Sequence, residues 1–260
     1  MTEAEPGVRL DRDGPVATVT LCRPHVLNAQ TPAMWGALRH LGRDIPGDVR
    51  VVVVRGEGRA FSAGLDLGAV RSSEGSTMDG SGFAGIAAHD DEAAQATIAG
   101  YQEAFSWLRR PDLVSIAAVQ SHAIGAGFQL ALACDLRILT ENAQFTMAEV
   151  SLGLVPDLGG TKRLVELVGY ARAMDLCITG RRVPSAEALR IGLATSVVPD
   201  AGLDQAVADL TAQILAVHRD AVVEIKSLLA GAAARTFAEQ EAAERAAQVR
   251  RIRDLVGQGD

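Results

Sequence analysis

The sequence has little of what marks several common protein classes. Its three cysteines, Cys22, Cys134 and Cys177, form no Cys-x-x-Cys pair, so they support neither a disulfide scaffold nor a zinc site. Aromatic residues make up only 4% and the net charge is -7, which argues against a nucleic-acid-binding surface. No apolar run reaches the roughly 18 residues of a membrane span, and the N-terminus lacks a signal-peptide pattern. We therefore expect a soluble, cytoplasmic protein that binds no metal, nucleic acid or membrane.

Several catalytic motifs are also missing. The sequence contains no Gly-x-x-x-x-Gly-Lys-[Ser/Thr] phosphate loop and no His-Glu-x-x-His pair. Gly125-Ala126-Gly127 lacks the third glycine of a dinucleotide fingerprint. Ala60 stands where a nucleophile elbow around Ser62 would need glycine. The motifs therefore support none of the common nucleotide-binding, zinc-peptidase or serine-hydrolase chemistries.

Strand and helix patterns alternate along the chain and predict an α/β fold. Hydrophobic residues make up 48%, which suits a sizeable core. The valines from 51 to 54 indicate a strand buried on both faces. Residues 71–91 show no sustained period and predict an irregular surface segment. The expected strands are 8–11, 16–21, 49–55, 114–120, 135–139, 144–147 and 195–198, and the expected helices are 31–41, 93–108, 161–168, 171–178, 186–191, 203–217, 221–229 and 236–255.

Three segments place small residues and polar groups where expected strands end. The first, residues 58–67, contains Phe61-Ser62-Ala63-Gly64-Leu65. The second, residues 118–129, contains Gly125-Ala126-Gly127 and ends at Gln129, and the third, residues 145–161, contains Glu149 and Asp157. Each segment alone has an ordinary explanation, such as a tight turn or close helix packing.

In this order and at these separations, the three segments resemble the enoyl-CoA hydratase/isomerase, or crotonase, superfamily. The resemblance also includes Arg23-Pro24 and Leu27-Asn28-Ala29. It implies a spiral ββα core over residues 1–200 and a C-terminal helical region over residues 201–260. Both belong to one structural unit, in which the helical region covers the active site and joins subunits into a homotrimer or a dimer of trimers.

The resemblance further implies an acyl-CoA thioester as the substrate, with coenzyme A as part of that substrate and no permanently bound cofactor. When a proton is removed beside a thioester, negative charge develops on the carbonyl oxygen, and two fixed backbone N–H donors stabilise it. By resemblance these donors are the N–H groups of Ser62 and Ala126. The residues expected to contact the substrate and its coenzyme A are Leu27, Ala29, Ser62, Ala63, Gly64, Leu65, Gly125 and Ala126.

The acid–base residues decide which reaction is expected. Hydratases of the family carry two glutamates, and this chain has Glu149 at one position but Gln129 at the other. A glutamine takes up no proton, whereas one carboxylate suffices to move a double bond. Asp157 matches the position of an aspartate used by dienoyl-CoA isomerases. The pattern therefore favours an enoyl-CoA double-bond isomerase with Glu149, Asp157 and Gln129 as its catalytic candidates.

Other functions stay open on the sequence. An enoyl-CoA hydratase, which converts 2-enoyl-CoA to 3-hydroxyacyl-CoA, is the first alternative. A non-catalytic acyl-CoA-binding member that keeps both loops is the second, although the presence of Glu149 argues against it. Hydrolysis of a CoA thioester is a weaker rival. The acyl chain itself is not revealed by these residues.

Overall fold

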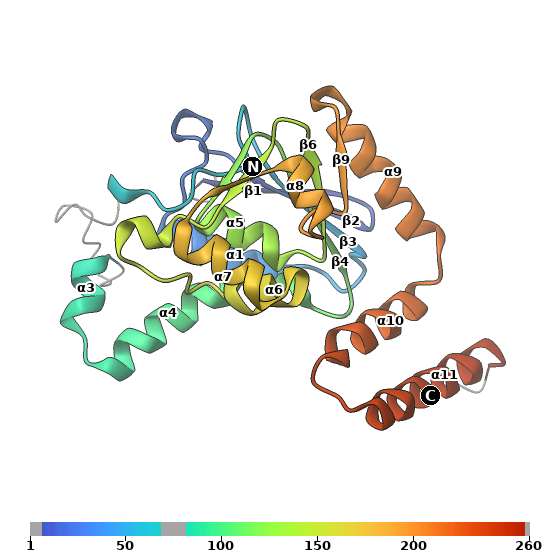
Figure 1. Cartoon of the computed structure of the whole chain (residues 1–260). Coiled ribbons are helices and arrows are strands. Elements are labelled where there is room, and N and C mark those ends of the chain that lie inside the picture. The colour runs from blue at the N-terminus through green and yellow to red at the C-terminus, as the bar shows by residue number, and fades with distance from the viewer. Residues whose placement is uncertain (1–6, 69–81, 258–260) are drawn as a thin grey trace.

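The computed structural model describes residues 7–68 and 82–257, which form two sheets flanked by helices (Figure 1). The larger sheet has the order β1-β2-β3-β4-β6-β9, with β1 antiparallel to β2 and the other neighbours parallel. The smaller sheet has the order β5-β7-β8. The strands are β1 (Val8–Asp13), β2 (Val16–Leu21), β3 (Val51–Gly56), β4 (Val114–Val119), β5 (His122–Ile124), β6 (Leu136–Thr140), β7 (Gln144–Thr146), β8 (Arg182–Pro184) and β9 (Ser196–Val198).

The helices lie close to the expected ranges, with additions. The α-helices are α1 (Pro32–Asp44), α3 (Phe83–Ala88), α4 (Asp91–Ser106), α5 (Ala126–Ala133), α6 (Gly160–Val168), α7 (Tyr170–Thr179), α8 (Ser185–Arg190), α9 (Leu203–Ala216), α10 (Arg219–Ala232) and α11 (Phe237–Leu255). The short 3-10 helices are η1 (Pro24–Val26), η3 (Trp107–Arg109), η4 (Glu149–Leu152) and η5 (Asp200–Gly202). Among the described residues, no helix is both long and apolar enough to cross a membrane.

The prediction of an irregular segment over residues 71–91 is wrong in its C-terminal part. Phe83–Ala88 form α3, and α4 begins at Asp91 with the Asp90 side chain accepting a hydrogen bond from the N–H of Ala93. Residues 71–81 of that prediction lie outside the described residues. The sequence also missed β5 and β8, which are three residues long each.

The valines of β3 alternate between two cores. Val51 and Val53 face α9 and pack in a cluster that includes Leu203. Val52 and Val54 belong to the main core on the opposite face. Because residues of a strand point alternately to its two faces, a continuous valine run is what a sheet covered on both sides requires. Helix α9 therefore covers one face of the larger sheet, and the main core covers the other face.

Successive turns of the chain add one strand to each sheet and then a helix. β4 joins the larger sheet, β5 joins the smaller sheet, and α5 follows. β6, β7 and α6 repeat this order, with the short helix η4 between β7 and α6. A parallel bridge between Ser62 and Ala123 extends the smaller sheet back to the turn that follows β3. The expected ββα spiral is thus the observed connection pattern, and it stacks the loops after successive strands side by side.

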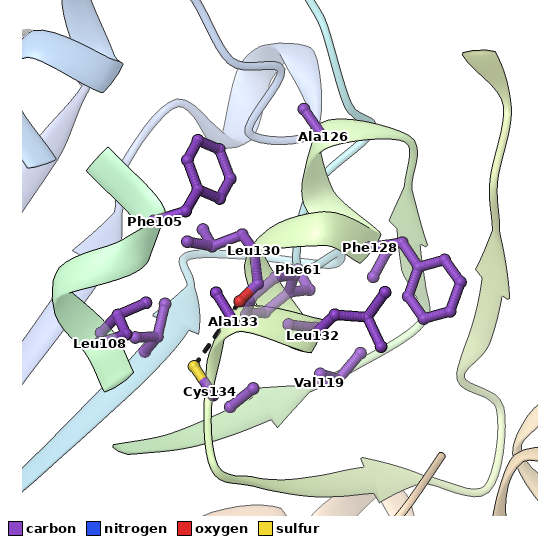
Figure 2. Close-up of a cluster of buried hydrophobic side chains, with 14 of the residues drawn as sticks. Phe61, Phe105, Leu108, Val119, Ala126, Phe128, Leu130, Leu132, Ala133 and Cys134 are labelled. Carbon is purple, nitrogen blue, oxygen red and sulfur yellow. Dashed lines mark hydrogen bonds between the residues drawn. The ribbon is translucent and has the colours of Figure 1, made fainter. Parts of the chain in front are cut away.

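Helix α5 is buried along its whole length. Figure 2 shows Leu130 on this helix lying toward Phe105 and Leu108, while Ala126 stands at its first turn. At the other end, the buried Arg137 guanidinium donates to the carbonyl oxygens of Cys134 (2.7 Å) and Leu193 (2.6 Å). Burial lowers the pKa of Arg137 to about 10. The helix that begins at Ala126 is therefore held by packing on its sides and by a buried cation beyond its C-terminus.

Helices α10 and α11 lie beside the body of the molecule (Figure 1). Lys226 on α10 donates to the Leu113 carbonyl and to Asp135, each at 2.7 Å. Large apolar side chains on both helices are exposed, among them Leu229 (71%), Phe237 (82%) and Leu255 (73%). These exposed apolar groups lie on two helices that contact each other.

Candidate active site

A cavity of about 520 Å³ lies where the loops after β3 and β5 meet α1, α3, α4 and the segment from Ala148 to Leu158. This volume suits a small-molecule ligand. The lining residues are Pro32, Trp35, Ala63, Gly64, Leu65, Leu67, Phe83, Ile86, Ile98, Tyr101, Ile124, Gly125, Ala126, Gln129, Ala148, Glu149, Ser151, Leu152, Leu154, Val155, Asp157 and Leu158. Most of the residues predicted from the sequence therefore meet in one place, namely Ala63, Gly64, Leu65, Gly125, Ala126, Gln129, Glu149 and Asp157.

Three predicted residues lie next to the cavity without lining it. Ser62 is fully buried, and Ala29 is 9% exposed. The carbonyl of Leu27 accepts a hydrogen bond from the N–H of Ala63 at 2.8 Å, which ties this segment to the loop after β3. Leu27 and Asn28 both adopt a left-handed backbone, with φ of 54° and 56°. The structure thus brings residues 27–29 up to the site from behind the loop.

The prediction that Ser62 supplies an oxyanion donor is wrong in this structure. The N–H of Ser62 donates to the carbonyl of His122 at 2.9 Å, and the N–H of Ile124 donates to the carbonyl of Ser62 at 3.0 Å. These two hydrogen bonds form the parallel bridge between Ser62 and Ala123, which extends the smaller sheet. A backbone donor that already holds a sheet together is not available to a ligand.

The N–H of Leu65, three residues further along this loop, differs from that of Ser62 in its pairing. On the side facing Gln30, the flanking groups are used: Gln30 N–H donates to the Gly64 carbonyl (2.6 Å), and Asp66 N–H donates to the Gln30 carbonyl (2.8 Å). Because alternate residues of an extended chain point their N–H groups to opposite sides, the N–H of Leu65 points away from Gln30. No described residue accepts it, and Leu65 lines the cavity.

Ala126 supplies a second free donor close by. It is the first residue of α5, so its N–H has no partner inside the helix and lies at the positive end of the helix dipole. Gly64 brings the two loops together: a Cβ on Gly64 would lie 2.6 Å from the Ile124 carbonyl oxygen and 3.7 Å from the Ala126 nitrogen. Its φ of +88° also requires glycine. Two N–H groups that no described residue accepts therefore face one cavity from adjacent loops.

Glu149 is the most deeply buried acid of the cavity, at 8% exposure. Its Oε1 accepts a hydrogen bond from Gln129 Nε2 at 2.7 Å. Its Oε2 is buried and has no partner among the described residues. An unpaired buried oxygen lowers the free energy of unfolding by about 1–3 kcal/mol. A ligand that donates a hydrogen bond to this oxygen would recover that energy.

The Gln129 amide has a fixed orientation. Its Oε1 accepts from the N–H groups of Leu158 (2.9 Å) and Gly160 (3.3 Å) at the start of α6. Both acceptor sites of the oxygen are then used, so the amide nitrogen must face Glu149. Gln129 thus links the carboxyl of Glu149 to the N-terminus of α6, and its oxygen is not free to accept a bond from water.

Both acids of the cavity have raised pKa values. Burial raises the pKa of Glu149, while a hydrogen bond from its own backbone N–H and the bond from Gln129 lower it, and the nearby charge of Asp157 raises it further. Burial also raises the pKa of Asp157. Gln102 on α4 donates to the Asp157 carbonyl oxygen at 2.7 Å, which attaches the segment carrying Asp157 to α4. A carboxyl group with a raised pKa suits both acceptance and return of a proton near neutral pH.

The aromatic wall of the cavity was missed by the sequence. Trp35, Phe83 and Tyr101 line it, and the rings of Trp35 and Tyr101 lie 4.9 Å apart between centroids. Helical spacing in α1 and α4 marks Trp35 and Tyr101 only as residues of a buried face. Phe83 belongs to the segment where the sequence shows no period, so no pattern could have found it.

Known proteins match the chain along most of its length. The family model described as enoyl-CoA hydratase/isomerase matches residues 11–255. Carnitinyl-CoA dehydratase of Salmonella typhi is 35% identical over 224 residues, covering 85% of this chain and 79% of that protein.

Solved structures agree with the observed fold. A candidate enoyl-CoA hydratase of Thermobifida fusca YX in complex with CoA has 48% sequence identity and a TM-score of 0.90, covering 98% of this chain and 96% of that one. The form in complex with acetoacetyl-CoA has 50% identity and a TM-score of 0.91, covering 96% of each chain. The enoyl-CoA hydratase of Mycobacterium smegmatis has 28% identity and a TM-score of 0.82, covering 94% and 90%. These matches confirm the fold implied by the sequence resemblance, and the chain belongs to the enoyl-CoA hydratase/isomerase (crotonase) family of enzymes.

Proposed function

We propose that the chain catalyses the reversible addition of water to the C2=C3 double bond of an enoyl-CoA thioester. The observation that carries this proposal is Glu149, a buried carboxyl of the cavity with one unpartnered oxygen. The similar proteins support it, because hydratase and dehydratase are names for the two directions of one reaction. Related structures contain CoA and acetoacetyl-CoA, which supports a CoA thioester as the ligand of this site.

The N–H groups of Leu65 and Ala126 are the proposed oxyanion donors. When water attacks C3, electrons move through C2 to the thioester oxygen, and that oxygen becomes the acceptor of both donors. Removing one donor of this kind typically costs about 2.7–4 kcal/mol in transition-state stabilisation. The support is geometric, since both N–H groups are unused by described residues and stand on adjacent loops.

Glu149 is the proposed proton carrier. In its ionised form it takes a proton from the attacking water while the oxygen bonds to C3. It then returns a proton to C2, which neutralises the enolate and restores the ionised carboxylate. Gln129 is a positioning residue in this scheme, because its amide donates to Glu149 and cannot itself take up a proton.

The isomerase favoured by the sequence becomes the second candidate. Its specific support is that no second carboxylate stands at position 129, whereas Asp157 lines the same cavity. In that reaction Glu149 would remove a proton from C2 of a 3-enoyl thioester and return it to C4. The names of the similar proteins favour hydration instead. The alternative of a non-catalytic binder has lost support, because the chain retains a buried carboxyl and belongs to a family of enzymes.

We also propose a homotrimer or a dimer of trimers that assembles through the C-terminal helices. The exposed apolar side chains of α10 and α11 support it. Within one chain, no described residue after Leu158 lines the cavity. A cover over the active site from residues 201–260 would therefore have to come from a neighbouring subunit.

A panel of thioesters tests the proposed reaction. Wild-type enzyme should convert 2-enoyl-CoA to 3-hydroxyacyl-CoA faster than it moves the double bond of 3-enoyl-CoA or dienoyl-CoA. Products are identified by mass spectrometry and chromatography against standards. Rapid double-bond migration without hydration would contradict the proposal and leave the isomerase.

Glu149→Gln should reduce turnover by about 10²–10⁴-fold, because the amide keeps the size but transfers no proton. The control Glu141→Gln changes an exposed carboxylate outside the cavity and should leave turnover unchanged. Since burial raises the pKa of Glu149, wild-type activity should rise with pH through an apparent pKa above the ordinary value of 4.5. If Glu149→Gln is nearly silent while Asp157→Asn is inactive, the proton carrier is Asp157.

Gln129→Glu should raise hydration by about tenfold or more, since it supplies the second acid–base group. One oxygen can keep the bonds from Leu158 and Gly160, and the other would face Glu149 Oε1 across the 2.7 Å contact now made by the amide. Two carboxyl groups at this short distance share a proton, which raises the pKa of one of them. Gln129→Met is the neutral control and should lower turnover. Reduced hydration by Gln129→Glu at an unchanged melting temperature would contradict this expectation.

Assembly is measured by multi-angle light scattering at micromolar concentration. The mass should be three or six times that of one chain. Replacing Leu229 and Phe237 by serine removes apolar area from the exposed helices and should reduce the mass. A monomeric wild-type protein would refute the proposed assembly.

A further inference from the structure

Gln30 is a fully buried polar residue that holds the loop after β3 from the side opposite the cavity. Its backbone forms a parallel bridge with Leu65. The N–H of Gln30 donates to the Gly64 carbonyl at 2.6 Å, and its carbonyl accepts the N–H of Asp66 at 2.8 Å. These two bonds fix the side of the loop that faces Gln30, so the N–H of Leu65 is kept on the other side, toward the cavity.

The side-chain amide of Gln30 has only one possible orientation. The indole Nε1 of Trp35 donates to Gln30 Oε1 at 2.8 Å, and an indole nitrogen can only donate. The amide nitrogen therefore faces its other neighbour, the Ser62 hydroxyl, to which it donates at 3.1 Å. That hydroxyl donates in turn to the carbonyl of Asn28 at 2.8 Å. A buried series of hydrogen bonds, each with a fixed direction, thus runs from Trp35 to the backbone beside the loop.

The Ser62 hydroxyl lies between the two proposed oxyanion donors. It accepts the N–H of Gly64 at 3.2 Å, which fixes the loop after β3 from within. A Cβ on Gly127 would lie 2.7 Å from Ser62 Cβ and 2.9 Å from its Oγ, so the first turn of α5 rests directly on this side chain. The residue that holds the hydroxyl in place therefore acts on both the loop and the helix start.

Trp35 extends the same hydrogen bonds to the wall of the cavity. It lines the cavity, is 6% exposed, and packs against the ring of Tyr101. Its indole N–H is buried and needs an acceptor, which Gln30 provides. The ring that borders a ligand and the loop that would bind the thioester oxygen therefore share one buried amide.

We infer that Gln30 is a positioning residue for the reaction: it holds the N–H of Leu65 toward the thioester oxygen and ties that donor to Trp35 in the cavity wall. The inference rests on the proposed role of Leu65 as an oxyanion donor. Gln30 itself is not among the residues that line the cavity, so it acts through the loop. Because a misplacement of about 1 Å costs about 10²-fold in rate, the amide affects turnover more than binding.

The vibrational frequency of a bound thioester carbonyl tests the inference. Hydrogen bonds to a carbonyl oxygen lower its stretching frequency, and butanoyl-CoA labelled with carbon-13 at the carbonyl is a saturated thioester that cannot be hydrated. In difference infrared spectra, wild-type protein should lower this frequency relative to the thioester in water. Gln30→Met keeps the side-chain length without its hydrogen bonds and should reduce that shift. Its kcat should fall about 10–100-fold with little change in KM.

Three further variants separate a positioning role from a loss of stability. Ser62→Ala removes the next group of the series and should change both readouts in the same direction. Trp35→Phe keeps the ring without its N–H and should have a smaller effect of the same kind. The control Ser115→Ala removes a buried hydroxyl outside the cavity, which donates to the Leu108 carbonyl at 2.7 Å. It should lower the melting temperature but leave the carbonyl frequency and kcat unchanged.

A carbonyl shift in Gln30→Met equal to that of wild-type protein would overturn the inference. Circular dichroism checks folding, and if Gln30→Met does not fold, Ser62→Ala and Trp35→Phe decide by the same readouts. A wild-type shift that Gln30→Met reduces, in an enzyme that hydrates no 2-enoyl-CoA, would overturn the proposed reaction and keep the inference. If wild-type protein produces no shift, the donor role of Leu65 and the inference are both wrong.

Discussion

The parallel register between Ser62 and Ala123 determines the geometry of the whole site. In this register the N–H of Ser62 forms a hydrogen bond within the smaller sheet. Three residues later, the N–H of Leu65 faces the cavity. The same register sets Gly64 against Ile124, so the first turn of α5 stands beside the loop after β3. A shift of one residue would reverse which N–H groups face the ligand. The burial of α5 and the Arg137 bonds beyond its end keep that register from moving.

Gln129 connects this backbone geometry to the acid–base group. Its oxygen is held by the first N–H groups of α6, so its nitrogen is directed at Glu149 and leaves one carboxylate oxygen without a partner. A glutamate at this position would bring two acids together, whereas the amide separates the positioning role from proton transfer. The chain therefore has one buried acid, Glu149, bound by an amide, and a second acid, Asp157, that lines the same cavity.

Much of this arrangement could be predicted from the sequence, and the failures have physical causes. The valine run of β3 and the glycines around Ala126 carry local signals, so the strand and the loop were found. Glu149, Asp157 and Gln129 were located because their spacing matched a known family. Ser62 was chosen over Leu65 because sequence does not show which side of an extended loop is paired. The roles of Phe83 and of the Gln129 oxygen depend on contacts between distant segments, which local patterns do not contain.

The central claim is that Leu65 and Ala126 bind the thioester oxygen while Glu149 faces C2. A crystal structure of the protein with acetoacetyl-CoA tests it most directly. The account predicts the thioester oxygen at about 2.7–3.1 Å from both backbone nitrogens, with the Glu149 carboxylate against C2 and the bond between Ser62 and His122 intact. A thioester oxygen bound by the N–H of Ser62, or one that meets neither Leu65 nor Ala126, would contradict the account.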